Sequence, residues 1–210
     1  MKFRRKSTEA EQDPGPEVEQ DPAEGVDLST LRATGPYDAD DAPDDDVLRM
    51  DLGCVLIAPT EGSEVRIQVD EATEAVQGVL LVAQDGAMEL RAFAAPRNGD
   101  LWSEVRPKIA ADFAQRGGTA DEREGRFGTE LLCRVTVTTP DGGTGTQPSR
   151  VIGINGPRWM LRATLLGRPA VEVDDAELWE EALARVVVRR GTAPMPPGAE
   201  LPLSLPRDGS

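Results

Sequence analysis

The clearest chemical signal in the sequence is a set of two arginines and two tryptophans, one pair around a predicted helix start and one after a Gly-Pro turn: Arg97, Trp102, Arg158 and Trp159. Arginine binds carboxylates and phosphates through a planar fork of N–H groups, and tryptophan buries a large area at interfaces. If the turn lies beside the helix start, the four residues form one edge for binding a ligand or a partner. The alternative is that both tryptophans belong to the core and both arginines face solvent.

Paired carboxylates offer acid–base or cation chemistry at three places. Asp100 and Glu104 stand one helical turn apart, a spacing that suits a proton donor and acceptor, although helix capping and a first-turn charge explain both. The aspartate runs at 44–46 and 174–175 supply oxygen ligands for hard cations, but neither has the alternate spacing and turn glycine of a calcium loop. We therefore predict no catalytic residue and no metal site.

The chain contains no histidine, which excludes Ser-His-Asp and Cys-His catalysis as well as histidine-containing zinc sites. Cys54 and Cys133 stand far apart in apolar, strand-like runs, so two buried thiols are favoured over a disulfide. The glycine-rich segment 141–146 lacks the Lys-Ser/Thr ending of a phosphate-binding loop and leads into a strand. We expect a hairpin loop there and no cofactor.

The segment 88–117 must position the arginine and tryptophan side chains. Residues 88–95 have strand character, Pro96 and Gly99 break the strand, and Asp100 is placed to cap a helix. The predicted inner face of this helix is Leu101, Val105, Ile109 and Phe113. Pro107 requires either a kink or a regular part that starts near it.

Short apolar segments separated by turn signals predict an antiparallel sheet. The predicted strands are 47–58, 64–70, 75–84, 88–95, 129–139, 151–155 and 158–166. A second helix begins at Asp174 or Asp175, and residues 186–188 either finish it or start a short strand. The order predicts an α+β fold in which two helices cover one face of the antiparallel sheet.

Composition divides the 210 residues into three parts. Residues 1–46 hold fourteen acidic and five basic side chains and few large apolar ones, which predicts a disordered acidic tail whose segment 35–38 pins it to the domain. Residues 47–190 form a single α+β domain, and 191–210 form a Pro-rich extended tail. The alternating leucines at 201, 203 and 205 dock either on a partner or, as we favour, on the chain's own sheet.

The overall charge limits the classes of partner. A net charge of −15 and an aromatic content of 4% argue against direct nucleic-acid binding, which needs a basic surface and stacking side chains. The basic start at residues 1–6 is not followed by an apolar stretch, and no run approaches 18 apolar residues. We expect a cytoplasmic protein without a membrane span.

Several motifs in one order carry a resemblance to a known family: GPYD, FAAPR followed by LW and EVR, FGTEL, NGPRWMLR, and PMPP with LPLSLP. Together they resemble an uncharacterised actinobacterial family of unknown function, over residues 35–206. The resemblance implies an intracellular protein often encoded near a deoxyuridine-triphosphate hydrolase and a small OB-fold-like nucleic-acid-binding protein. It implies no activity. The expected fold is also loosely similar to Mog1/PsbP-like domains.

These observations favour a noncatalytic cytoplasmic binding or adaptor domain with a protein partner, in which the acidic tail modulates binding at the arginines and tryptophans. One alternative is a histidine-independent enzyme or binder that acts on a nucleotide or another phosphorylated ligand. Another is an accessory protein for a nucleic-acid-binding OB-fold partner.

Overall fold

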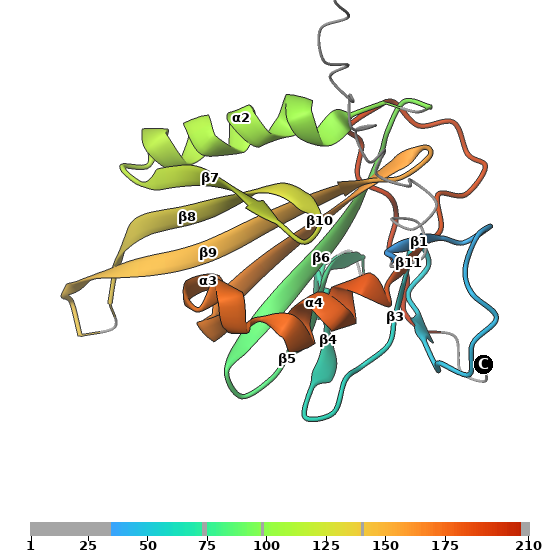
Figure 1. The fold of residues 1–210 in the computed structure, drawn as a ribbon, viewed down its shortest axis with the longest axis horizontal. Coiled ribbons are helices and arrows are strands. Elements are labelled where there is room, and N and C mark those ends of the chain that lie inside the picture. Colours follow the sequence, from blue (N-terminus) through green and yellow to red (C-terminus); the bar gives the residue numbers. More distant parts are fainter. Residues whose placement is uncertain (1–34, 73–74, 98, 140, 207–210) are drawn as a thin grey trace, which may run out of the picture.

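Two sheets and three α-helices make up the fold, a computed structural model that describes residues 35–72, 75–97, 99–139 and 141–206 (Figure 1). The large sheet contains β4 (Glu64–Val69), β5 (Val76–Val82), β6 (Gly86–Ala94), β7 (Thr119–Gly125), β8 (Gly128–Thr138), β9 (Thr144–Asn155) and β10 (Trp159–Gly167). The small sheet contains β1 (Tyr37–Asp38), β2 (Met50–Asp51), β3 (Val55–Ile57) and β11 (Val187–Val188). The helices are α2 (Leu101–Gln115), α3 (Arg168–Val171) and α4 (Glu177–Ala184), with a 3-10 turn η1 (Val173–Asp175).

The large sheet is antiparallel throughout, in the order β4-β5-β6-β10-β9-β8-β7. The small sheet has the order β1-β11-β3-β2, in which only β1 and β11 are parallel. The predicted α+β class with a mostly antiparallel sheet is therefore confirmed. Within the described part of the chain, no helix is long and apolar enough to cross a membrane.

Two apolar clusters lie on opposite faces of the large sheet. Along β10, Trp159 and Leu161 point into a cluster with α4, which we call the α4 cluster, whereas Met160 points into a second one with α2, the α2 cluster. Successive strand residues face opposite sides, so the helices that these clusters contact must do so too. The prediction that two helices cover one face is therefore not met: α2 and α4 lie on opposite sides of the sheet (Figure 1).

Three local predictions need correction. The predicted strand 47–58 is split into β2 and β3, because Gly53 between them adopts a φ of +83° that interrupts the extended chain. The charged stretch 119–125, which the predicted strands leave out, forms β7, an edge strand that pairs with β8 and so needs no apolar alternation. β9 starts at Thr144 rather than at 151, since it continues the hairpin with β8.

The N-terminal boundary of the folded region lies earlier than the predicted residue 47. Tyr37 and Asp38 form β1 beside β11, and the Trp159 Nε1–H donates a hydrogen bond to Asp38 Oδ2 at 2.6 Å. Segment 35–38 therefore lies on the domain, as predicted. Residues 1–34, the rest of the predicted acidic tail, lie outside the described residues.

The C-terminal segment docks on its own domain and joins the two sheets. Ala94 N–H donates to Ala199 O and Leu201 N–H donates to Ala92 O, both at 2.8 Å. These bonds pair the C-terminal segment with the last residues of β6. Further on, Ser204 N–H donates to Leu52 O at 3.0 Å, beside the small sheet. The favoured prediction of docking in cis is therefore confirmed for Leu201 and Leu203, whereas Leu205 is exposed.

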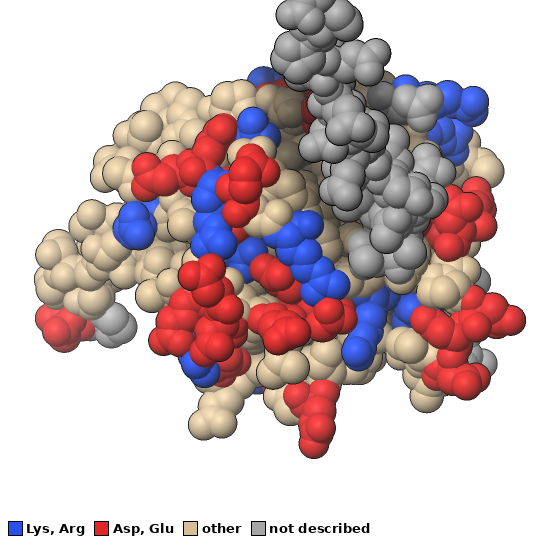
Figure 2. Space-filling model, in the orientation of Figure 1, with Lys and Arg blue, Asp and Glu red and all other residues tan. Residues whose placement is uncertain are grey.

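A buried ionic network joins the large sheet to α4. The side chains of Glu130 on β8 and Arg150 on β9 are 0% and 1% exposed, and Arg150 donates to both carboxylate oxygens of Glu130 at 2.9 Å. Arg150 also binds Glu180 of α4, and Arg123 lies 3.4 Å from Glu130. Opposite charges continue over the surface of this face, where basic and acidic side chains are intermixed around α3, α4 and β7 (Figure 2).

Replacement of Arg150 by methionine should lower the free energy of unfolding by about 3–5 kcal/mol, because it leaves the Glu130 carboxylate buried without its main partner. The measurement is chemical denaturation of the full chain. Arg168→Met is the matched control, since the ion pairs of Arg168 are solvent-exposed, and it should change stability by no more than about 0.5 kcal/mol. Equal unfolding midpoints for the two variants would contradict the assigned role of the network.

Docking of the C-terminal segment gives a second test. Leu201 is 1% exposed and belongs to the α4 cluster, whereas Leu205 is 52% exposed. Leu201→Ala should destabilise the chain by about 2–5 kcal/mol through the cavity it leaves, and Leu205→Ala by no more than about 0.5 kcal/mol. Urea titration measures both, and similar small effects would mean that the segment does not dock in solution.

Candidate functional site

The turn between β9 and β10 lies directly against the start of α2. Asn155 Nδ2–H donates to Asp100 Oδ1 at 2.8 Å, and Asn155 Oδ1 accepts from the Trp102 backbone N–H at 3.1 Å. The Ala95 N–H also donates to the Arg158 carbonyl oxygen at 2.9 Å. The sequence predicts one binding edge if the Gly-Pro turn lies beside the helix start, and in the structure the two are neighbours.

The two tryptophans are core residues on opposite faces of the sheet. Trp102 is 4% exposed in the α2 cluster, and Trp159 is 2% exposed in the α4 cluster. Each ring rests on a glycine: a Cβ atom at Gly153 would lie 2.1 Å from the Trp102 ring, and one at Gly156 would lie 2.1 Å from that of Trp159. Both tryptophans therefore belong to the core, as the alternative interpretation of the sequence states.

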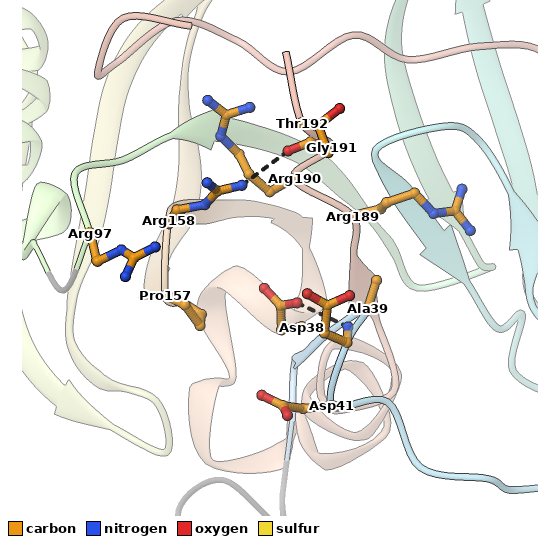
Figure 3. A pocket seen from close by; sticks show the side chains of 11 residues that line it. Asp38, Ala39, Asp41, Arg97, Pro157, Arg158, Arg189, Arg190, Gly191 and Thr192 are labelled. Carbon is orange, nitrogen blue, oxygen red and sulfur yellow. Dashed lines mark hydrogen bonds between the residues drawn. The ribbon is translucent and has the colours of Figure 1, made fainter. Parts of the chain in front are cut away.

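Arg97 and Arg158, by contrast, meet at a cleft of about 630 Å³ that is open to solvent. We call it the arginine–aspartate cleft. Its lining residues are Asp38–Asp41, Arg97, Pro157, Arg158 and Arg189–Thr192. Figure 3 shows the Arg97 and Arg158 side chains on one side of the opening and the aspartates on the other.

The arginines on the cleft differ in how far they are already engaged. Arg97 is exposed and has no hydrogen bond or ion pair to any residue that the structure describes. Arg158 uses one Nη2–H to bind Gly191 O at 3.2 Å, while Arg189 binds both oxygens of Asp51 at 3.0 Å. Arg190 binds Ala193 O at 3.1 Å, and its buried Nε has no partner among the described residues. Arg97, Arg158 and Arg190 thus retain donors for a ligand.

The aspartate side of the cleft was not predicted from the sequence. Asp38 is fixed, since its Oδ2 accepts from Trp159 and its Oδ1 from the Asp40 backbone N–H at 3.0 Å. The Asp41 N–H donates to Asp38 O at 3.0 Å, so a tight turn presents the exposed carboxylates of Asp40 and Asp41. Their composition matches the predicted acidic tail, and the pairing of β1 with β11 is what brings them to the cleft.

Asp100, the carboxylate considered for acid–base catalysis, is engaged as the cap of α2. Its oxygens accept hydrogen bonds from the Ser103 Oγ–H, from the Ser103 N–H at 3.0 Å and from Asn155. The hydrogen bond from the Ser103 side chain, followed by that from its backbone, holds the pKa of Asp100 below its usual value. The predicted capping role is confirmed, and Pro107 is accommodated inside the helix.

The cysteines and the aspartate runs have structural surroundings. Cys54 and Cys133 are free and buried, as predicted, and burial raises their pKa values to about 12 and about 11, so both thiols stay protonated at neutral pH. In the two runs, Asp45 pairs with Arg49 and Asp174 with Arg123. Over the described ranges, no group of three or more acidic or cysteine side chains is placed to hold a metal ion.

Comparison with known proteins gives a family and no activity. A family model described as "Protein of unknown function (DUF3710)" matches residues 35–210, which confirms the predicted membership of a family of unknown function; the likeness to Mog1/PsbP-like domains stays a prediction. No curated protein matches the chain. A crystal structure of a protein from Bacteroides thetaiotaomicron VPI-5482 matches with a TM-score of 0.38 and 11% identity, over 68% of this chain and 48% of that one. The chain thus spans about half the length of that protein.

Loss of the Asp100 cap should destabilise the chain in a pH-dependent way. Asp100→Ala should lower the free energy of unfolding by about 0.5–2 kcal/mol at pH 7. Because the folded-state pKa lies below the unfolded one, the ionised carboxylate stabilises the fold at and above the unfolded value of about 3.9. The difference between wild type and variant should therefore shrink as the pH falls through the lowered pKa.

Urea titrations between pH 7 and pH 3 measure this difference. Asp112→Ala, which removes an exposed carboxylate near the other end of α2, is the control and should change stability by no more than about 0.5 kcal/mol. A stability loss in Asp100→Ala that stays constant down to the lowest pH would exclude the charged cap as its cause.

Proposed function

The chain belongs to the DUF3710 family of unknown function, and on that premise we propose that it is a noncatalytic cytoplasmic binding domain that holds an anionic group of a protein partner in the arginine–aspartate cleft. The observation that carries this proposal is Arg97. It is an exposed arginine on the rim of a cleft and has no partner within the described residues. An arginine in that position offers its full fork of donors to a carboxylate or phosphate.

Arg158 supports the same proposal because it faces the same opening from a separate loop. The loop that carries it is fixed by hydrogen bonds from Ala95 and through Asn155 to the α2 start. Binding loses less conformational entropy when the binding groups are already held in place. The pair is therefore prepared to clamp one anionic group, with Arg190 as a further donor on the same side.

A phosphorylated small molecule is the second candidate, since the same arginines suit a phosphate. None of the described residues that line the cleft is aromatic, so they offer a nucleobase no stacking surface. The groups considered for catalysis are occupied or unreactive, since Asp100 caps α2 and both thiols are buried and protonated at neutral pH. These observations favour a binding role and an anionic group on a protein.

The test uses the full chain and a double variant, Arg97→Gln with Arg158→Gln. Isothermal titration with pyrophosphate, a generic oxyanion probe, should give an affinity roughly tenfold or more below that of wild type, because each charge-assisted hydrogen bond contributes about 1.5–3 kcal/mol. Partners captured from the native lysate by the wild-type chain should be lost in parallel.

A charge-matched control separates the cleft from the general loss of positive charge. Arg66→Gln with Arg134→Gln removes two exposed arginines outside the cleft and should bind as the wild type does. If the cleft variant and the control retain equal pyrophosphate affinity and capture the same proteins, the proposed function is wrong.

A further inference from the structure

We propose that the ligand of the arginine–aspartate cleft is dipolar: a peptide segment that places an acidic group at Arg97 and Arg158 and a basic group at Asp40 and Asp41. This inference rests on the proposed function and names the class of ligand. It follows from the second side of the cleft, which a purely anionic ligand leaves unexplained.

Opposite charges face each other across the cleft without touching. Figure 3 shows Arg97 and Arg158 on one side and Asp38 and Asp41 on the other. In the described part of the chain, no ion pair within 4.0 Å joins an aspartate of the cleft to any of its arginines. Arg189, which also lines the cleft, pairs with Asp51, which does not.

Both sides are held at their separation by hydrogen bonds to the fold. On the aspartate side, Ala39 N–H donates to Val188 O at 2.9 Å, and Trp159 fixes Asp38. On the arginine side, Arg158 and Arg190 bind backbone carbonyls of the segment after β11. The space between them, about 630 Å³, falls within the range of ligand pockets and admits several side chains.

The arrangement discriminates against ligands of a single sign. An anion attracted by the arginines is also repelled by the carboxylates opposite, and a cation meets the reverse situation. A molecule that carries an acidic and a basic group is attracted by both sides of the cleft. Arg190 also lines the cleft and adds positive charge to the arginine side.

A peptide suits the cleft better than a small zwitterion does. The cleft is formed by exposed loops and is open to solvent, so a chain can lie across it with its backbone outside and two side chains inside. An acidic and a basic side chain a few residues apart then reach the two sides. The recognised feature is the spacing of opposite charges along a partner.

The experiment compares two synthetic peptides on the full-length chain by isothermal titration. Both have blocked ends and read two glutamates, three glycines and two lysines, and in the second peptide both lysines are acetylated. The free-lysine peptide should bind about threefold or more tightly, as expected for charge pairs at a partly exposed site. In the variant Asp40→Asn with Asp41→Asn this preference should disappear, while its pyrophosphate affinity should rise above that of wild type.

Asp44→Asn with Asp46→Asn is the matched control, because it removes the same charge from exposed positions outside the cleft and should keep the lysine preference. Equal affinity of wild type for the two peptides, or a preference that survives in the Asp40/Asp41 variant, overturns the dipolar ligand. If pyrophosphate binding still depends on Arg97 and Arg158, the proposed function stands without it. If wild type binds neither peptide nor pyrophosphate, both proposals fail together.

Discussion

The alternation of side chains along β10 is the constraint on which the rest of the structure depends. β10 lies in the middle of the large sheet, between β6 and β9, so each of its residues must belong to one of two interiors. Trp159 and Leu161 build the interior beneath α4, and Met160 builds the one beneath α2. A register shift of one residue would exchange these sets and remove the apolar surface that each helix covers. Arg158 directly precedes this strand, and hence its place on the cleft follows from the same register.

The cleft forms where four connecting segments meet at one end of the strands of that sheet. The β9–β10 turn, the loop before α2, the turn after β1 and the segment after β11 are far apart in sequence, yet all four contribute to it. Hydrogen bonds between main-chain groups set their relative positions, and the charged side chains then project from a rigid frame. A rigid frame keeps the opposite charges apart, whereas a mobile loop would let them approach each other and pair.

Sequence patterns predicted the features that short-range chemistry decides. The predicted strands 64–70 and 75–84 and the Asp100 cap are each specified by a few neighbouring residues, and all three occur, as β4, β5 and the start of α2. Other features depend on distant partners. The charged stretch that forms β7 has no strand pattern of its own, and Asp40 and Asp41 match an acidic tail in composition. For the tryptophans, the local pattern allowed either a core or an interface position. In the structure each ring packs against a glycine, Gly153 or Gly156, where a side chain would collide with it.

The pairing of β1 with β11, and of the C-terminal segment with β6 and Leu52, bears on how the protein is made. β1, at residues 37–38, cannot pair until β11, at residues 187–188, has been translated, and Leu201 reaches the α4 cluster later still. On the ribosome, the α4 cluster therefore stays incomplete until residue 201 has emerged. Contacts of such long sequence separation also slow folding once synthesis is complete. During that interval the apolar faces of the large sheet are incompletely covered, and transiently exposed apolar surface is prone to aggregation.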